Sequence, residues 1–114
     1  MLQSQNVFGH IHSIEDVIPV ANSLINKGTG ADKFWASAAQ VVLQGIIAAL
    51  YVDGKRTNKE LWLAVTSPIP VIADLCASVS LGTEGCCIIA DPTSKQAIVV
   101  VSWLWLNLRW LELD

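Results

Sequence analysis

The stretch ADKFWASAAQVVLQGIIAALYVDG, residues 31–54, decides the fold, because it is the longest segment with a clear helical pattern. Its apolar residues recur every three to four positions, as they do along one side of an α-helix. Further apolar residues widen this side until little of the helix is left to face water, and such a helix is buried. The pattern therefore predicts a central helix at about 32–53, with Asp32 as its N-cap.

The start of this helix carries an aromatic pair, Phe34 and Trp35, which we expect to pack into the core and fix the first turn. Small residues farther along, among them Ala39 and Gly45, would let neighbouring helices approach closely. The segment has no pattern typical of a nucleophile, a phosphate loop or a metal site. We therefore interpret the helix itself as scaffold.

Helix start signals divide the rest of the chain. Ser13, followed by two acidic residues, predicts a helix whose regular part starts near Pro19. Thr57 and Glu60 form a capping-box pattern that predicts the start of a second helix, and Ser94 predicts the start of the last one. That last segment, about 94–113, is rich in Val and Trp, but it is longer than a strand of about ten residues. The sequence predicts a single all-α domain over residues 1–114, a compact bundle of five to six helices with a long C-terminal helix.

The composition narrows the function. Hydrophobic residues make up 53% of the chain and charged residues 15%, against about 25% in a typical domain. The formal net charge of −3 argues against a domain-wide basic surface for nucleic acid. No uninterrupted apolar run reaches the roughly 18 residues of a membrane span, so we expect no membrane insertion. The first residues lack the pattern of a secretory signal, and we expect a cytoplasmic location.

The cysteines and histidines of the sequence give little support for a catalytic or metal site. Cys76, Cys86 and Cys87 lie among apolar residues and are interpreted as buried thiols. His10 and His12 flank one residue and would share a face if this segment were extended, but no third metal ligand is identifiable. We expect that this chain is not an enzyme and holds no metal or cofactor of its own; a small metal protein is the least favoured alternative.

Two features remain as candidate contact surfaces. Lys55, Arg56 and Lys59 are the only cationic cluster, in and just after the turn that follows the central helix. Such a turn is ordinarily solvated, but these side chains could also contact phosphates or a protein partner. The chain also has five Trp residues, and those of the last helix cannot all point the same way. Part of this aromatic surface should therefore contact another molecule.

The order of segments resembles a known family, the all-α domain of conjugative coupling proteins, which are TraD, TraG and TrwB-type ATPases of type IV secretion systems. The most specific elements are the opening Asn-x-Phe and the pattern formed by Asp32, Phe34, Trp35 and Ala39. The segments that carry the resemblance are NVFGHIHSIEDVIPVANSLI (6–25), ADKFWASAAQVVLQGIIAALY (31–51), RTNKELWLAV (56–65) and DPTSKQAIVVVSWLWLNLRWL (91–111).

The resemblance implies a context for this chain. In that family the all-α domain is inserted in a RecA-like domain of a membrane-anchored hexamer, at its cytoplasmic end. ATP and Mg²⁺ would then belong to the parent protein, and the chain would be a domain excised from it. The implied partners are a relaxase or relaxosome accessory protein, single-stranded DNA, and the rest of the coupling ATPase.

Two functions follow as hypotheses. In the first, the domain recruits substrates of conjugative DNA transfer, either a relaxosome or secreted protein or the DNA itself. In the second, it is a structural helical insert that spaces subunits of the hexamer and has no ligand of its own. For contact with DNA or a partner, the candidate residues are Lys55, Arg56 and Lys59.

Overall fold

The computed structural model describes residues 6–26, 29–30 and 32–113, except for the side chain of Leu113. Within these residues all regular secondary structure is helical and there is no strand, which confirms the predicted all-α class. The α-helices are α1 (Val17–Leu24), α2 (Asp32–Val52), α3 (Asn58–Val65), α4 (Ile69–Ala77), α5 (Thr83–Ile88) and α6 (Lys95–Leu108). Short 3-10 helices cover Val7–His10, Ile14–Asp16, Ser80–Gly82 and Arg109–Leu113.

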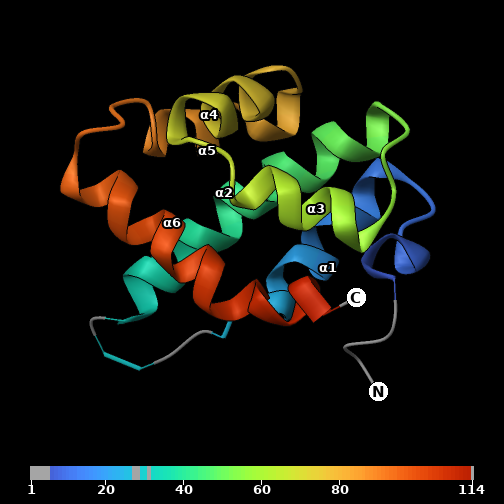
Figure 1. The fold of residues 1–114 in the computed structure, drawn as a ribbon, viewed down its shortest axis with the longest axis horizontal. Coiled ribbons are helices and arrows are strands. Elements are labelled where there is room, and N and C mark those ends of the chain that lie inside the picture. The colour runs from blue at the N-terminus through green and yellow to red at the C-terminus, as the bar shows by residue number, and fades with distance from the viewer. Residues whose placement is uncertain (1–5, 27–28, 31, 114) are drawn as a thin grey trace.

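Helix α2 is the centre of the bundle, as predicted from its all-round apolar pattern. It packs against each of the other five α-helices, which surround it (Figure 1). The side chains of Val42, Leu43 and Ile46 are fully buried. The helix ends at Val52, one residue before the predicted end. Because the other helices are short, most of their stability comes from burying one face on α2.

A close approach of backbones joins α2 to the segment between α4 and α5. A methyl group added at Gly45 would lie 2.7 Å from the Cα atom of Gly82 and 3.0 Å from the Sγ atom of Cys76. A methyl group at Gly82 would overlap the main chain of Cys76. The small residues of α2 were predicted to admit neighbouring helices, and Gly45 does so here.

The first turn of α2 corrects one prediction. Phe34 was expected in the core, but its side chain is 61% exposed. Trp35 is half-buried against the core and meets the Phe34 ring edge to face, with 4.9 Å between ring centroids. Adjacent helical residues point about 100° apart, so both rings cannot enter the same core. Ala39, by contrast, is fully buried. Of the pattern formed by Asp32, Phe34, Trp35 and Ala39, only the side of the helix that carries Ala39 and part of Trp35 faces the core.

Asp32 also differs from its predicted role. It is the first residue of α2 and not the N-cap that precedes the helix. Its amide donates to the Thr29 carbonyl at 3.1 Å, so the chain is already turning before the helix begins. The carboxylate still lies in the first turn, where it interacts favourably with the helix dipole.

The first helix begins in two stages. A 3-10 turn follows Ser13, whose amide donates to the Asp16 carboxylate at 3.3 Å. Regular α1 then begins at Val17, two residues before Pro19, which is tolerated in the first turn. Regular α1 thus begins two residues before the predicted start near Pro19, after a first turn that is 3-10 and not α-helical.

Polar side chains from α2 and α6 hold the end of α1. The amide of Gln40, a buried residue on α2, donates to the carbonyls of Asn22 at 3.2 Å and Ile25 at 3.3 Å. On α6, the side chain of Asn107 accepts from the Asn26 amide at 3.0 Å. The Gln40 bonds satisfy carbonyls that the C-terminal end of α1 leaves without partners, and the Asn107 bond ties the residue after the C-cap to α6.

The last helix has the predicted start and a different end. The Ser94 hydroxyl accepts from the Ala97 amide at 3.1 Å, which confirms Ser94 as the N-cap of α6. The α-helical part stops at Leu108, and Arg109–Leu113 continues as a 3-10 helix. The predicted helix at about 94–113 therefore changes its winding in the last turns.

Among the residues that the structure describes, one helix is long and apolar enough to cross a membrane by length and composition. This is α2, whose most apolar 18-residue window has a mean hydropathy of 1.5, and 61% of that window is buried within the fold. The pair α3 and α4 passes the same test only if taken together, but it is bent by 119°. Because α2 is surrounded by its own helices, we interpret it as the core helix of this bundle.

Candidate functional site

The turn between α2 and α3 holds the predicted cationic cluster, and its shape follows from the way α2 ends. Gly54 adopts a positive φ of 79°, which glycine accepts without strain. The Lys55 amide can then donate back to the Leu50 carbonyl at 2.9 Å. This geometry closes α2 with a left-handed residue and turns the chain toward α3. Lys55 and Arg56 consequently lie at the surface, at one end of the molecule.

Helix α3 begins at the predicted cap, with Thr57 as its N-cap residue. The Thr57 hydroxyl accepts from the Glu60 amide at 3.1 Å and donates to the Glu60 carboxylate at 2.9 Å. Lys59 lies in this first turn and is exposed. The cap fixes the direction in which α3 leaves the turn.

The structure brings Lys55, Arg56 and Lys59 to one surface, but it gives them different surroundings. The Lys55 ammonium is 3.3 Å from the Asp53 carboxylate, and both side chains are more than half exposed. A solvated ion pair of this kind contributes about 0–1 kcal/mol, so Lys55 stays available to another anion. Lys59 makes no ion pair with any residue that the structure describes.

Arg56 is held by its own chain. Its Nε and Nη2 atoms donate to the Tyr51 carbonyl at 3.2 and 3.0 Å, and the guanidinium lies 4.0 Å from the centre of the Tyr51 ring. This stacking on an aromatic face is a favourable cation–π arrangement. Arg56 therefore stabilises the turn itself, and the other two members of the predicted cluster, Lys55 and Lys59, are less constrained by their own chain.

The N-terminal segment supports the same turn, a relationship that the sequence patterns did not reveal. The Asn6 amide donates to the Arg56 carbonyl at 2.9 Å. The Asn58 side chain is buried and accepts from the Val7 amide at 2.8 Å. The opening Asn-x-Phe was noted as a signature element, but its pairing with residues about 50 positions later gave no signal in a single sequence. Hydrogen bonds from the N-terminal segment thus help to hold the α2–α3 turn and the start of α3 in place.

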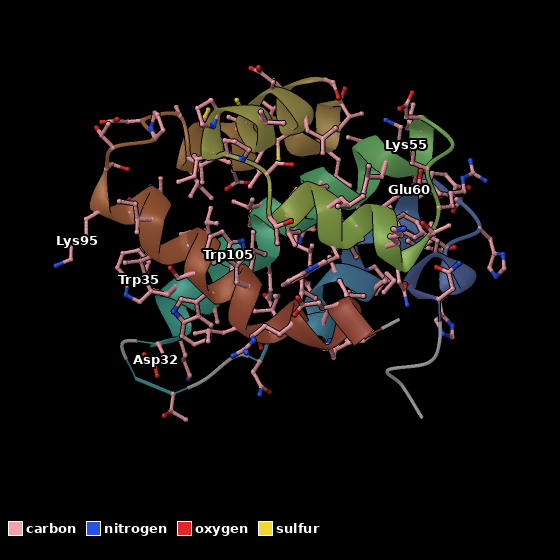
Figure 2. All side chains as sticks on the ribbon, in the orientation of Figure 1. Asp32, Trp35, Lys55, Glu60, Lys95 and Trp105 are labelled. Carbon is pink, nitrogen blue, oxygen red and sulfur yellow. The ribbon has the colours of Figure 1, made fainter. Side chains whose placement is uncertain are left out.

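Helix α3 lies between two hollows lined mainly by apolar side chains. The first, which we call the α3–α6 pocket, has a volume of about 510 Å³ and is lined by Trp62, Thr66, Ser102, Trp105, Leu106 and Arg109. The second, which we call the α3–α4 groove, has a volume of about 570 Å³ and is lined by Leu50, Lys55, Glu60, Leu63, Ala64, Ser67, Val71, Asp74, Leu75 and Ser78. Figure 2 shows Trp105 on α6 facing α3, and Lys55 and Glu60 near the N-terminal end of α3.

Large apolar side chains stand open to solvent around these hollows. Leu106 is 68% exposed at the α3–α6 pocket, and Leu63 is 58% exposed at the α3–α4 groove. Exposed apolar patches of this kind mark contact surfaces more often than isolated residues do. The predicted outward-facing Trp is Trp105, at 44% exposure, whereas Trp103 and Trp110 are half-buried.

Trp105 also links the two helices of the α3–α6 pocket. Its indole N–H donates to the Val65 carbonyl at 2.6 Å. The hydroxyls of Thr66 and Ser102 are engaged with carbonyls of their own helices, at 2.8 Å in each case. Among the described lining residues, the one charged group left to meet a ligand is the guanidinium of Arg109.

The residues considered for metal or redox chemistry are not brought together. His10 ends a 3-10 helix, so the extended segment expected to align it with His12 is not formed. Within the described residues, no group of three or more His, Cys, Asp or Glu is placed to hold a metal ion. Of the thiols predicted to be buried, Cys76 is buried, but Cys86 is half-buried and Cys87 is exposed. The short α5 has one side on the core and leaves Cys87 on the other.

The environment of Cys76 makes its thiol inert. Burial, together with the nearby Cys86, raises the pKa of Cys76 to about 12. Its Sγ atom contacts the Val42 carbonyl at 3.7 Å. A thiol with so high a pKa contains very little thiolate at neutral pH, and thiolate is the nucleophilic form.

The architecture and the surface define a class of protein: an all-helical module built on one buried helix, with apolar hollows on both sides of a short surface helix. Among known families, the model described as the type IV secretion-system coupling protein DNA-binding domain matches residues 3–113. Since this match spans nearly the whole chain, the chain belongs to that family. Comparison with curated proteins and with solved structures gave no match.

Proposed function

We propose that this domain recruits the substrates of conjugative DNA transfer to a type IV secretion coupling protein. The observation that carries the proposal is the surface on both sides of α3. There the α3–α6 pocket and the α3–α4 groove expose apolar side chains beside the lysines of the α2–α3 turn. Membership of the coupling-protein family supplies the setting in which such a surface would act.

The physical argument is that α3 exposes more apolar surface than folding alone requires. Its inner side, at Leu61 and Val65, is fully buried and is enough to anchor the helix. Exposure of Leu63 on the outer side costs solubility and gains nothing for the bundle. A protein partner that covers this side would bury the exposed apolar surface of α3, and nearby charges would orient the partner.

A protein substrate is favoured over DNA as the main ligand. The chain has a net charge of −3, and Arg56 is engaged with Tyr51. Affinity for nucleic acid rests largely on the number of phosphates that cations contact. Lys55 and Lys59 would supply a small local contact to single-stranded DNA passing nearby. A relaxase or a relaxosome accessory protein is therefore the proposed principal partner.

The rest of the proposed setting comes from the family. The domain would sit within a RecA-like ATPase at the cytoplasmic side of the inner membrane. The parent protein would bind ATP and Mg²⁺ and form the hexamer. The present chain would have no catalytic role of its own.

The test is a titration of the 114-residue chain with the cognate relaxase and with each accessory protein, followed by calorimetry. A saturable complex is expected with at least one of them. The variant Leu63→Lys should weaken it, whereas Ile18→Lys, at an exposed apolar residue of α1 that lines neither hollow, should not. Absence of binding to every cognate substrate would refute the proposal.

The alternative is a structural insert that spaces subunits of the hexamer. It gains support from the contacts that two of the three cations make within their own turn, Lys55 with Asp53 and Arg56 with Tyr51. The two functions separate in the parent protein after deletion of the domain. Retained ATPase activity and hexamer formation with unchanged substrate choice would favour the structural insert, whereas loss of transfer of one substrate class would favour recruitment.

A further inference from the structure

We propose that the α3–α6 pocket binds a segment of the protein substrate in which a large apolar side chain is followed closely by a carboxylate. This inference rests on the proposed recruitment function and names the chemistry that one part of the surface would recognise. It is carried by the lining of the pocket, by one fixed aromatic wall and by a single cation at its edge.

The apolar part of the pocket suits one large side chain. Trp62 and Trp105 contribute aromatic surface from opposite helices, and Leu106 adds an exposed aliphatic side chain. The volume of about 510 Å³ lies within the range of about 300–1,000 Å³ found for ligand sites. Since the Trp105 indole is already bonded to Val65, little freedom is lost when a partner packs against it.

The polar part of the pocket calls for an anion. Arg109 is the one charged residue among the described lining residues, and it makes no ion pair or side-chain hydrogen bond with any residue that the structure describes. The two lining hydroxyls, of Thr66 and Ser102, are bonded to helix carbonyls. The planar guanidinium matches a carboxylate through two parallel hydrogen bonds. A partner carboxylate placed beside the apolar side chain would therefore complete the site.

The same features favour a peptide over a nucleic acid strand. A groove that follows a DNA backbone combines stacking surfaces with several cations, and the α3–α6 pocket offers one. On the other side of α3, the α3–α4 groove carries two acidic residues, Glu60 and Asp74, against one cation, Lys55, and this balance disfavours a phosphate backbone. An acidic and apolar peptide meets Arg109 without approaching those carboxylates.

The experiment uses the 114-residue chain labelled with ¹⁵N and two synthetic nine-residue peptides. The probe peptide alternates Leu or Phe with Asp or Glu, and the comparison peptide carries Lys in place of each acidic residue. Chemical shifts are followed during titration, in particular the indole N–H signal of Trp105. The probe should shift this signal in a saturable way, and the comparison peptide should not.

Matched variants decide where the probe binds. Arg109→Gln should weaken binding by about tenfold, the usual loss for a hydrogen bond to a charged group. Lys95→Gln removes the same charge at the other end of α6 and should leave affinity unchanged. Leu106→Ala should weaken binding several-fold, whereas Ile98→Ala, also exposed on α6 but outside the pocket, should not. Thermal unfolding of each variant confirms that its fold is kept.

The outcomes separate this proposal from the recruitment function. Equal binding of the probe to the wild-type chain and to Arg109→Gln would overturn the pocket proposal. The pocket proposal would also be overturned if an oligothymidine strand bound in a way that depends on Arg109 while the probe did not bind. If the cognate relaxase binds Arg109→Gln and Leu106→Ala as tightly as wild type, recruitment stands and the pocket is not its site. If the relaxase binds none of these chains, recruitment itself fails.

Discussion

The indole N–H of Trp105 donates a 2.6 Å hydrogen bond to the main-chain carbonyl of Val65, the last residue of α3. The last carbonyls of an α-helix have no partner within their own helix, and Trp105 satisfies this one from α6. The bond therefore fixes the end of α3 and one wall of the α3–α6 pocket at the same time.

Replacing Trp105 with Phe tests this link. The ring stays but the donor is lost, and we expect the free energy of unfolding to fall by about 1 kcal/mol, the net value of a typical hydrogen bond. Urea denaturation measures the change. Trp103→Phe is the matched control, since Trp103 lies on the same helix and its indole N–H donates to no residue that the structure describes. An equal loss in both variants would mean that ring size, and not the bond, sets the effect.

The contact between α2 and the segment after α4 predicts a strong response at Gly45. Alanine there would place a methyl group 2.7 Å from Gly82 and 3.0 Å from the Cys76 sulfur. The Gly82 main chain can move only if its whole segment shifts, so we expect a loss of about 1–3 kcal/mol. Gly9→Ala, where an added methyl meets nothing within 4 Å, should change stability little. A neutral Gly45→Ala would show that the two segments pack less closely.

Much of this fold is predictable from local sequence patterns. The width of the apolar pattern identified α2 as the central helix, and Thr57 and Ser94 marked the starts of α3 and α6. These signals are local, because a cap or a helical period is written within a few residues. The prediction failed at Phe34, since an apolar residue in a helix pattern does not reveal whether a neighbouring helix reaches it. The change to 3-10 winding after Leu108 likewise gave no signal, because no turn residue or cap marks it in the sequence.

Asn58 is expected to be important for the N-terminal segment. Its buried side chain accepts from the Val7 amide at 2.8 Å, and alanine would leave that amide without this partner. A buried donor left unsatisfied costs about 1–3 kcal/mol. Hydrogen exchange should therefore become faster at Val7, and the unfolding free energy should fall. Lys59→Ala, at the exposed next position, should alter neither quantity by a comparable amount.

The candidate site was predicted less completely than the fold. The cluster of Lys55, Arg56 and Lys59 is visible in sequence, yet the stacking of Arg56 on Tyr51 depends on how the turn closes after Gly54. The α3–α6 pocket joins residues about 40 positions apart, and its geometry comes from the packing of two helices. Excess Trp in the last helix indicated an outward surface, but only the structure identifies Trp105 as the exposed member.

Cys76 gives the stability a pH dependence at alkaline pH. Its pKa is raised from 9.0 to about 12 in the folded chain, so the folded state holds this proton more tightly than the unfolded state. The contribution of the protonated Cys76 thiol to the free energy of unfolding is complete below pH 9 and is lost as the pH rises toward about 12. Urea denaturation at pH 8 and pH 10 should show this decrease. Cys87→Ala should retain it, and Cys76→Ala should show a smaller one; the same decrease in both variants would assign it to other groups.

The lysines of the α2–α3 turn predict how the chain responds to single-stranded DNA. If Lys55 and Lys59 contact phosphates, the double variant with Gln at both positions should bind an oligothymidine strand more weakly. Its log–log salt slope should fall by about 1.4, from two contacts at about 0.7 each. Adding Arg56→Gln should also lower stability, because this guanidinium supports the turn through Tyr51. Lys33→Gln with Lys95→Gln removes the same charge elsewhere and serves as the control. Unchanged affinity and slope in the turn variants would mean that these lysines are only solvated.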